Sequence, residues 1–245
     1  MDAIEKLALL LKSSRHLCVF TGAGISVPSG IPDFRSANGL YNRESKYHYP
    51  PEQIISHSFF TAHTELFYDF YKSSMLFPNA QPNDAHRFFA SLETDDRRVS
   101  VVTQNIDGLH QAAGSSEVYE LHGSVHRNFC QSCGKAFSLA DICEMPGVPH
   151  CDKCGGVIKP DVVLYEEPLN EDVVYGAISA IRRADVMVVV GTSLVVYPAA
   201  SYLQYFSGNS LVLINKSETA FDKTADLAFN DDVIHVVHQL QQYGV

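Results

Sequence analysis

Six short runs of β-branched and other apolar residues are the feature of this chain that most restricts its fold. The runs are HLCVF (16–20), RVSVV (98–102), EVYEL (117–121), DVVLY (161–165), DVMVVV (185–190) and LVLI (211–214). Near-continuous apolar runs of this length are typical of strands buried on both faces, as in a parallel sheet. Helical patterns lie between them, at 84–92, 107–113, 171–183 and 198–206. This alternation predicts an α/β fold with a Rossmann-like, doubly wound parallel sheet.

Polar residues and glycines follow several of these runs directly. They are Gly22, Gln104, Asn105, His122, Ser193 and Asn215. In open parallel sheets, ligands bind outside the carboxyl ends of the strands. We therefore expect these residues, which come from five separate segments, to meet at one edge of the sheet and form a ligand site.

Two segments depart from the alternating pattern. Residues 41–80 are rich in Tyr, Phe, His and Pro, with a predicted helix from 51 to about 76, and residues 126–157 hold five of the six cysteines. We interpret them as the helical part and the zinc-binding part of a smaller zinc-ribbon and helical lobe. Residues 1–40, 81–125 and 158–245 would then form the Rossmann-like domain.

The spacing of four cysteines predicts a metal site. Cys130 and Cys133, followed after 17 residues by Cys151 and Cys154, match the spacing of a zinc ribbon. A glycine follows each pair, where a knuckle turn needs positive φ. Disulfide bonds are the alternative, but no secretory signal accompanies them. Four thiolates complete a tetrahedron, so we predict one structural zinc ion rather than a catalytic one.

Charge and hydropathy restrict the partners. The formal net charge is −10, and the chain has no Lys/Arg-rich run, so we expect no nucleic-acid partner; a basic peptide would suit this field better. The apolar runs are too short to cross a bilayer, and the N-terminus lacks the features of a signal peptide. We therefore expect a cytoplasmic protein with no membrane partner. The sequence leaves the oligomeric state open and is compatible with a monomer.

The segment TGAGISVPSGIPDFR (21–35) contains a glycine turn followed by an irregular loop. At Gly22-Ala23-Gly24, backbone N–H groups can approach a pyrophosphate closely because no bulky side chain intervenes. Two prolines and a glycine prevent a regular helix after the turn, and long loops beside strand ends usually serve ligands. Phe34 could cover a flat ring, Arg35 could pair with a phosphate, and Asp33 could accept a hydrogen bond from an amide. A tight turn and a surface loop with an ordinary ion pair are the alternatives.

Together, GAGIS…SGIPDFR, TQNIDGLH, ELHG, the two C-x2-C pairs, GTSLVVYPAA and IN before KSET closely resemble the sirtuins. These are NAD-dependent protein-lysine deacylases. The resemblance runs in order from about Leu7 to about Val237. It implies that a Rossmann-like domain and a zinc-bearing lobe enclose a cleft for NAD, the co-substrate, and for an acetylated lysine of a protein or peptide.

The resemblance also implies roles for individual residues. NAD would contact Gly22, Ala23, Gly24, Asp33, Phe34, Arg35, Gln104, Asn105, Ile106, Asp107, His122, Gly191, Thr192, Ser193, Asn215 and Asp232. Among these, Asn105, Ile106 and Asp107 would form the nicotinamide pocket, and Asn105 and Asp107 count with His122 as catalytic. His122 would be the general base that removes a proton from a ribose hydroxyl, because an imidazole titrates near neutral pH. The implied products are free lysine, nicotinamide and O-acetyl-ADP-ribose.

The substrate strand would lie between 162–165 and 194–197 and add to the protein by backbone pairing. Contacts to it are implied for Ile106, Asp107, Val163, Tyr165 and Val195. The sequence departs from the family at Tyr165-Glu166-Glu167, where Phe-Gly-Glu is usual, and at Val27, where a hydroxyl residue is common.

Alternatives remain open for the acyl group that is removed and for the reaction that is catalysed. Members that remove succinyl or malonyl groups carry a Tyr-x-x-Arg pair, and Tyr71 stands where that Arg would be, which favours an uncharged acyl group. The alternatives to acetyl removal are removal of longer uncharged acyl groups and mono-ADP-ribosyl transfer. A non-catalytic NAD or ADP-ribose sensor is a further alternative.

Overall fold

The larger part of the molecule is a six-stranded parallel sheet, seen in a computed structural model that describes residues 1–34, 39–40 and 47–245. Its strand order is β3-β2-β1-β7-β8-β9. The strands are β1 (His16–Thr21), β2 (Arg98–Thr103), β3 (Glu117–Glu120), β7 (Val186–Val190), β8 (Ser210–Asn215) and β9 (Leu227–Asn230). The order reverses between β1 and β7, which is the arrangement of a doubly wound sheet. The predicted fold class is confirmed.

Both faces of this sheet are covered, as the apolar runs predict. Along β1, Leu17 and Val19 face one core, whereas Cys18 and Phe20 face the other. The first core is covered by α1 (Ala3–Ser13), α5 (Asp84–Ser91) and α9 (Val233–Gln242), and the second by α8 (Glu171–Arg183) and the 3-10 helix η4 (Ala199–Tyr205). Helices on both faces fix the sheet, so that the loops after its strands begin from a rigid edge. No helix within the described ranges has the length and apolar character of a bilayer span.

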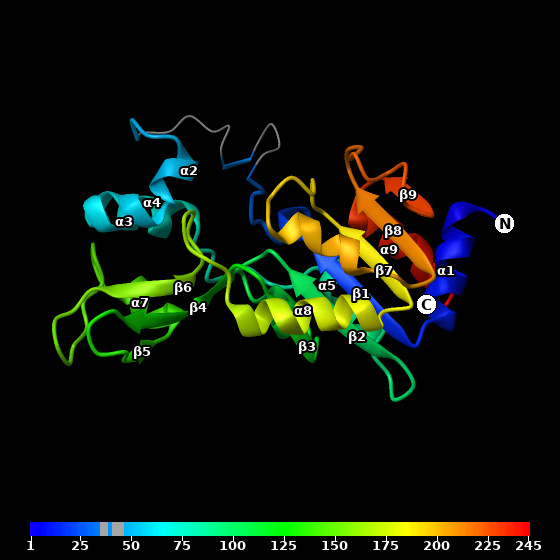
Figure 1. The fold of residues 1–245 in the computed structure, drawn as a ribbon, viewed down its shortest axis with the longest axis horizontal. Coiled ribbons are helices and arrows are strands. Elements are labelled where there is room, and N and C mark those ends of the chain that lie inside the picture. The colour runs from blue at the N-terminus through cyan, green and yellow to red at the C-terminus, as the bar shows by residue number, and fades with distance from the viewer. Residues whose placement is uncertain (35–38, 41–46) are drawn as a thin grey trace.

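A second, antiparallel sheet lies at the other end of the long axis (Figure 1). Its order is β5-β4-β6, with β4 (Gly123–Cys130), β5 (Ala136–Phe137) and β6 (Ile158–Val162), and α7 (Leu139–Glu144) packs against β4. The expectation that 161–165 forms a strand of the parallel sheet is therefore wrong. Residues of β6 alternate between buried and half-buried positions, because only one face of this small sheet is covered.

The single helix expected from 51 to about 76 is three helices instead. They are α2 (Pro51–Ile54), α3 (His57–Ala62) and α4 (Thr64–Ser74). Ser56 interrupts the pattern because its hydroxyl caps α3 by accepting a hydrogen bond from the Phe59 N–H at 3.2 Å. His63, with φ −135°, leaves the helical conformation between α3 and α4. Capping by local side chains thus overrides the apolar periodicity here.

Smaller departures follow from local hydrogen bonds. The helix expected at 107–113 is α6 (Leu109–Ala112), which begins late because the Asp107 carboxylate accepts from the Leu109 N–H at 2.9 Å. Gly108 then adopts φ 71°, outside the helical region. The irregular loop after β1 contains two single-turn 3-10 helices, η1 (Ala23–Ile25) and η2 (Val27–Ser29). None of these changes moves the strand ends that carry the candidate site.

Candidate functional site

The loops after the strands of the parallel sheet surround a cavity of about 1150 Å³. The predicted site residues that line it are Gly22, Ala23, Gly24, Asp33, Phe34, Gln104, Asn105, Ile106, Asp107, His122, Val163, Tyr165, Gly191, Thr192, Ser193, Asn215 and Asp232. Arg35 lies outside the described residues. Val195 is 57% exposed and does not line the cavity, whereas Val196 does, because successive side chains of a non-helical segment point in different directions. The expected convergence at one sheet edge is present.

The glycine turn touches the loop after β7. The Gly22 N–H donates to the Val190 carbonyl at 3.0 Å, and the Gly24 N–H donates to the Gly191 carbonyl at 2.8 Å. A Cβ on Gly22 would lie 2.6 Å from the Thr192 Cβ, and one on Gly24 would lie 2.6 Å from the Gly191 Cα. The two glycines are therefore required by the contact between the loops, and their own N–H groups are already bonded within the protein.

A buried hydrogen-bond network joins this turn to the loop after β2. The Asn105 side-chain amide donates to the Gly22 carbonyl and to the Ser26 hydroxyl, both at 3.1 Å. The Ser26 hydroxyl in turn donates to the Asp107 carboxylate at 2.7 Å. Burial raises the pKa of Asp107, although the bonds from the Leu109 N–H and from Ser26 oppose the shift. Ser26, which is 1% exposed, was missed by the sequence reasoning; its place in the GAGIS motif was the available signal.

His122 lies between β3 and β4 with a fixed ring. Its Nδ1 contacts the Gln104 carbonyl at 2.9 Å. A carbonyl only accepts hydrogen bonds, so Nδ1 carries the proton and Nε2 is left with a free lone pair. Burial lowers the pKa of His122, and the bond to Gln104 partly offsets that shift. The arrangement is that of a neutral imidazole that can accept a proton at Nε2.

The loops after β2, β7 and β8 are held together by side-chain amides. The Gln104 side chain donates to the Thr192 hydroxyl at 3.0 Å, and the Thr192 N–H donates to the Asn215 side-chain oxygen at 2.8 Å. The Nδ2 group of Asn215 is buried and has no hydrogen-bond partner among the described residues. A buried amide donor without a partner is costly, which fits a ligand oxygen or nitrogen at this position.

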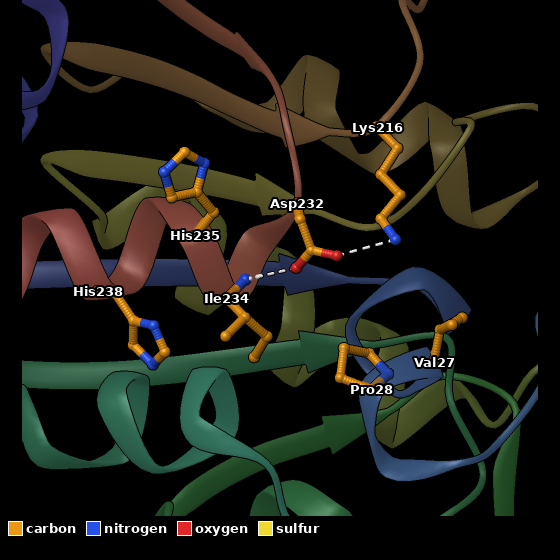
Figure 2. A pocket seen from close by; sticks show the side chains of 7 residues that line it. All are labelled: Val27, Pro28, Lys216, Asp232, Ile234, His235 and His238. Carbon is orange, nitrogen blue, oxygen red and sulfur yellow. Dashed lines mark hydrogen bonds and ion pairs between the residues drawn. The ribbon is translucent and has the colours of Figure 1, made fainter.

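Asp232 caps the start of α9 and lines the cavity. Figure 2 shows it in a smaller neighbouring pocket, which shares Asp232 and Lys216 with the cavity. Its carboxylate accepts from the Lys216 ammonium and from the Ile234 N–H, each at 2.8 Å. Burial alone would raise the pKa of Asp232, but these two partners hold it below its ordinary value. The carboxylate is thus ionised and already paired with Lys216, which follows Asn215 directly.

The segment after β6 connects the cavity to the helices α2 and α3. The Val163 N–H donates to the His122 carbonyl at 3.0 Å. The Tyr165 N–H donates to the Ile55 carbonyl, and the Tyr165 carbonyl accepts from the His57 N–H, both at 3.0 Å. Tyr165 therefore forms an isolated parallel β-bridge with Ser56, and it is 39% exposed.

The four predicted cysteine ligands converge at one point beside β4 and β6. All four sulfur atoms lie within 4.8 Å of one another, with Cys130 to Cys154 at 3.4 Å and Cys133 to Cys151 at 3.7 Å. Zinc–sulfur bonds of about 2.3 Å in a tetrahedron place sulfurs about 3.8 Å apart, so these thiols fit zinc. The glycine after each pair has positive φ, 70° and 72°, as predicted for knuckle turns.

The fold and the site together define a class. A doubly wound parallel sheet with a cavity at its switch point, lined there by glycines and side-chain amides, is typical of nucleotide-binding α/β proteins. In this protein a four-cysteine ribbon accompanies that sheet. More narrowly, the chain belongs to the Sir2 family, which residues 22–198 match.

Relatives with similar sequences cover almost the whole chain. The NAD-dependent protein deacetylases of Clostridium perfringens and Clostridium acetobutylicum are 54% and 52% identical, each over 95% of this chain and 96% of the relative. A solved Sir2 structure with a deacetylated p53 peptide and 3′-O-acetyl ADP ribose has a TM-score of 0.88, with 40% identity over 99% of both chains. A Sir2 structure with a p53 peptide and NAD+ has a TM-score of 0.84 and 40% identity over 100% of this chain and 99% of that one.

Proposed function

We propose that this protein is an NAD-dependent protein-lysine deacetylase. It transfers the acetyl group of an acetylated lysine to ADP-ribose and releases nicotinamide and O-acetyl-ADP-ribose. One observation carries the proposal: a neutral imidazole, His122, shares one cavity with the buried Asn105–Ser26–Asp107 network in a chain with more than 50% identity to protein deacetylases. When bound, NAD supplies the ribose that accepts the acetyl group and the nicotinamide that leaves.

The residues present fit this co-substrate. We assign its adenosine half to Thr192, Ser193 and Asn215, where the unpaired Nδ2 of Asn215 supplies a buried donor. Asn105 and Asp107 form the nicotinamide pocket, with Ile106 between them. The Asn105 amide is oriented by Gly22 and Ser26, so that pocket is assembled before any ligand enters it.

His122 acts as the general base in this proposal. Its Nδ1 proton is engaged with Gln104, so the free Nε2 lone pair takes the proton of a ribose hydroxyl. The lowered pKa of His122 keeps that nitrogen unprotonated at neutral pH. Val163 and Tyr165 border the path of the lysine, and the carbonyl of His122 is bonded to the Val163 N–H. The zinc lobe has a structural role because four thiolates leave no position for a reacting water.

Turnover of an acetyl-lysine peptide, with product identification by mass spectrometry, tests the proposal. We expect no deacetylation without NAD, and a loss of at least about a hundredfold in kcat for His122→Ala, as removal of a general base predicts. His238→Ala, at an exposed histidine on α9, is the matched control and should retain wild-type turnover. Deacetylation without NAD would reject the assignment, and ADP-ribosylated protein as the main product would favour the transferase alternative.

A further inference from the structure

Glu166 adopts a backbone conformation that favours glycine. Its φ is 78°, and Leu194 is the other described non-glycine residue with positive φ. A side chain in this region is strained, so it persists only where its surroundings hold it. The residue immediately follows Tyr165 and lines the large cavity.

The carboxylate of Glu166 is held by the first turn of α3. It accepts from the Ser58 N–H and from the Ser58 hydroxyl, both at 2.9 Å. The preceding residue, Tyr165, is hydrogen-bonded to 55–57 on the same side. The charge of Glu166 is thereby fixed in place beside the segment that we assign to the substrate, instead of moving freely in solvent.

Within residues 1–34, 39–40 and 47–245, no Lys, Arg or His side chain forms an ion pair with Glu166. Neighbouring Glu167 contacts the Lys159 ammonium at 3.0 Å and His57 at 2.8 Å, whereas both donors to Glu166 are neutral groups of Ser58. The described lining of the cavity as a whole contains eight Asp or Glu side chains against two Lys or Arg side chains, Arg127 and Lys216. A substrate strand that enters beside Glu166 therefore meets a negative field.

We propose that Glu166 is a specificity-determining residue that favours protein segments with a Lys or Arg beside the acetylated lysine. The inference rests on the proposed deacetylase function and adds the chemistry of the preferred substrate. The fixed carboxylate pairs with a cation on the substrate without first losing side-chain freedom, and it repels an acidic neighbour. Because the site is open to solvent, each such contact changes kcat/KM by about 2- to 5-fold and weakens with salt.

Matched acetyl-lysine peptides test this inference. Two sets differ in the flanking positions alone, Arg in one and Glu in the other, and each is measured for kcat/KM with NAD and for affinity by fluorescence polarisation. We expect the Arg set to be preferred by about 5- to 20-fold for two or more flanking charges at low salt, with a smaller ratio at high salt. Binding of the labelled peptides is read without turnover, so the inference is tested even if catalysis fails.

The variant Glu166→Gln keeps an oxygen that can accept from Ser58 and removes the charge. It should bring the Arg-to-Glu preference close to one, mainly through KM. Glu166→Gly, which suits φ 78°, should do the same and shows whether loss of the Ser58 contact matters. Glu144→Gln, an exposed site on α7 that does not line the cavity, is the control and should keep the full preference.

The outcomes are distinguishable. Equal affinity and kcat/KM for the two peptide sets, or a preference that survives in Glu166→Gln, would overturn the inference while the deacetylase function stands. Peptide binding with the expected preference but no NAD-dependent turnover of any acetyl peptide would reject the proposed function and leave the charge selection in place.

Discussion

Two buried histidines should make the stability of this protein fall steeply in mild acid. His110 is 1% exposed and His86 is fully buried, with ring centroids 4.9 Å apart. The Thr21 hydroxyl donates to the Thr103 hydroxyl at 2.8 Å, so the His110 Nε2 at 3.0 Å donates its proton to Thr21. The His110 Nδ1 and the His86 Nε2 are buried without partners among the described residues. Burial, with a smaller contribution from neighbouring charge, lowers the pKa of His110 to about 3 and that of His86 to about 4.

The size and sign of the effect follow from these values. Both imidazoles stay neutral in the folded protein, whereas the unfolded chain binds protons below its pKa of 6.5. The free energy of unfolding is therefore highest above pH 6.5 and falls as the pH drops toward the folded values. Below pH 6.5, each histidine lowers the free energy of unfolding by about 1.4 kcal/mol per pH unit. Between about pH 7.5 and about pH 5.5, only the last pH unit lies below 6.5, so the two histidines together lower the free energy of unfolding by about 3 kcal/mol.

Urea unfolding followed by circular dichroism measures this loss, because the chain has no tryptophan to report by fluorescence. The variant His110→Gln removes one titrating group, so its stability should fall by about 1.4 kcal/mol less than that of the wild type between the same two pH values. His238→Gln, at an exposed histidine bonded to Asp84, is the control and should track the wild type. An equal pH-dependent loss in His110→Gln and wild type would refute the reasoning.

Two further predictions concern the cavity. Ser26→Ala removes a buried donor to Asp107 and an acceptor of Asn105, so we expect a free energy of unfolding about 2–4 kcal/mol lower at pH 7.5 and a raised KM for NAD. Urea unfolding and steady-state kinetics measure these two effects, with Ser13→Ala at an exposed serine as the control; unchanged values would remove the role given to Ser26. Acetyl-lysine peptides should turn over faster than succinyl-lysine peptides, because Tyr71 stands where members that remove succinyl groups carry an arginine. Tyr71 is also 1% exposed and does not line the cavity. A comparison of kcat/KM that shows the reverse order would contradict this assignment.

The sheet edge was predictable because the relevant signals are local. An apolar run that ends in a glycine or an amide residue marks a strand end, and all such ends of one parallel sheet lie on the same side. Gly22, Asn105 and Asn215 were located in this way. The metal site was predictable for a similar reason, since two C-x2-C pairs can bring four sulfurs together with few assumptions about the rest of the chain. The contacts assigned to the acetyl-lysine peptide remain predictions.

Other features depend on contacts that periodicity does not report. The run 161–165 has the composition of a buried strand, yet which sheet it joins is decided by hydrogen bonds to β4, far away in the sequence. The amphipathic pattern from 51 to 76 is continuous, but Ser56 breaks it by capping α3. The strand β9 was missed because its residues alternate between half-buried and exposed positions at an edge of the sheet. Ser26 looks like one more small loop residue until its two partners are seen.

The hydrogen bond from the Val163 N–H to the His122 carbonyl joins the segment after β6, which we assign to the peptide, to the residue that we assign as the general base. The same residue is held a second time, since the Gln104 carbonyl accepts from the Nδ1 group of its ring. His122 is therefore anchored at its backbone by the segment after β6 and at its ring by the loop after β2. A shift of either segment would displace the imidazole relative to both ligands, so the alignment of NAD with the peptide depends on one doubly tethered side chain.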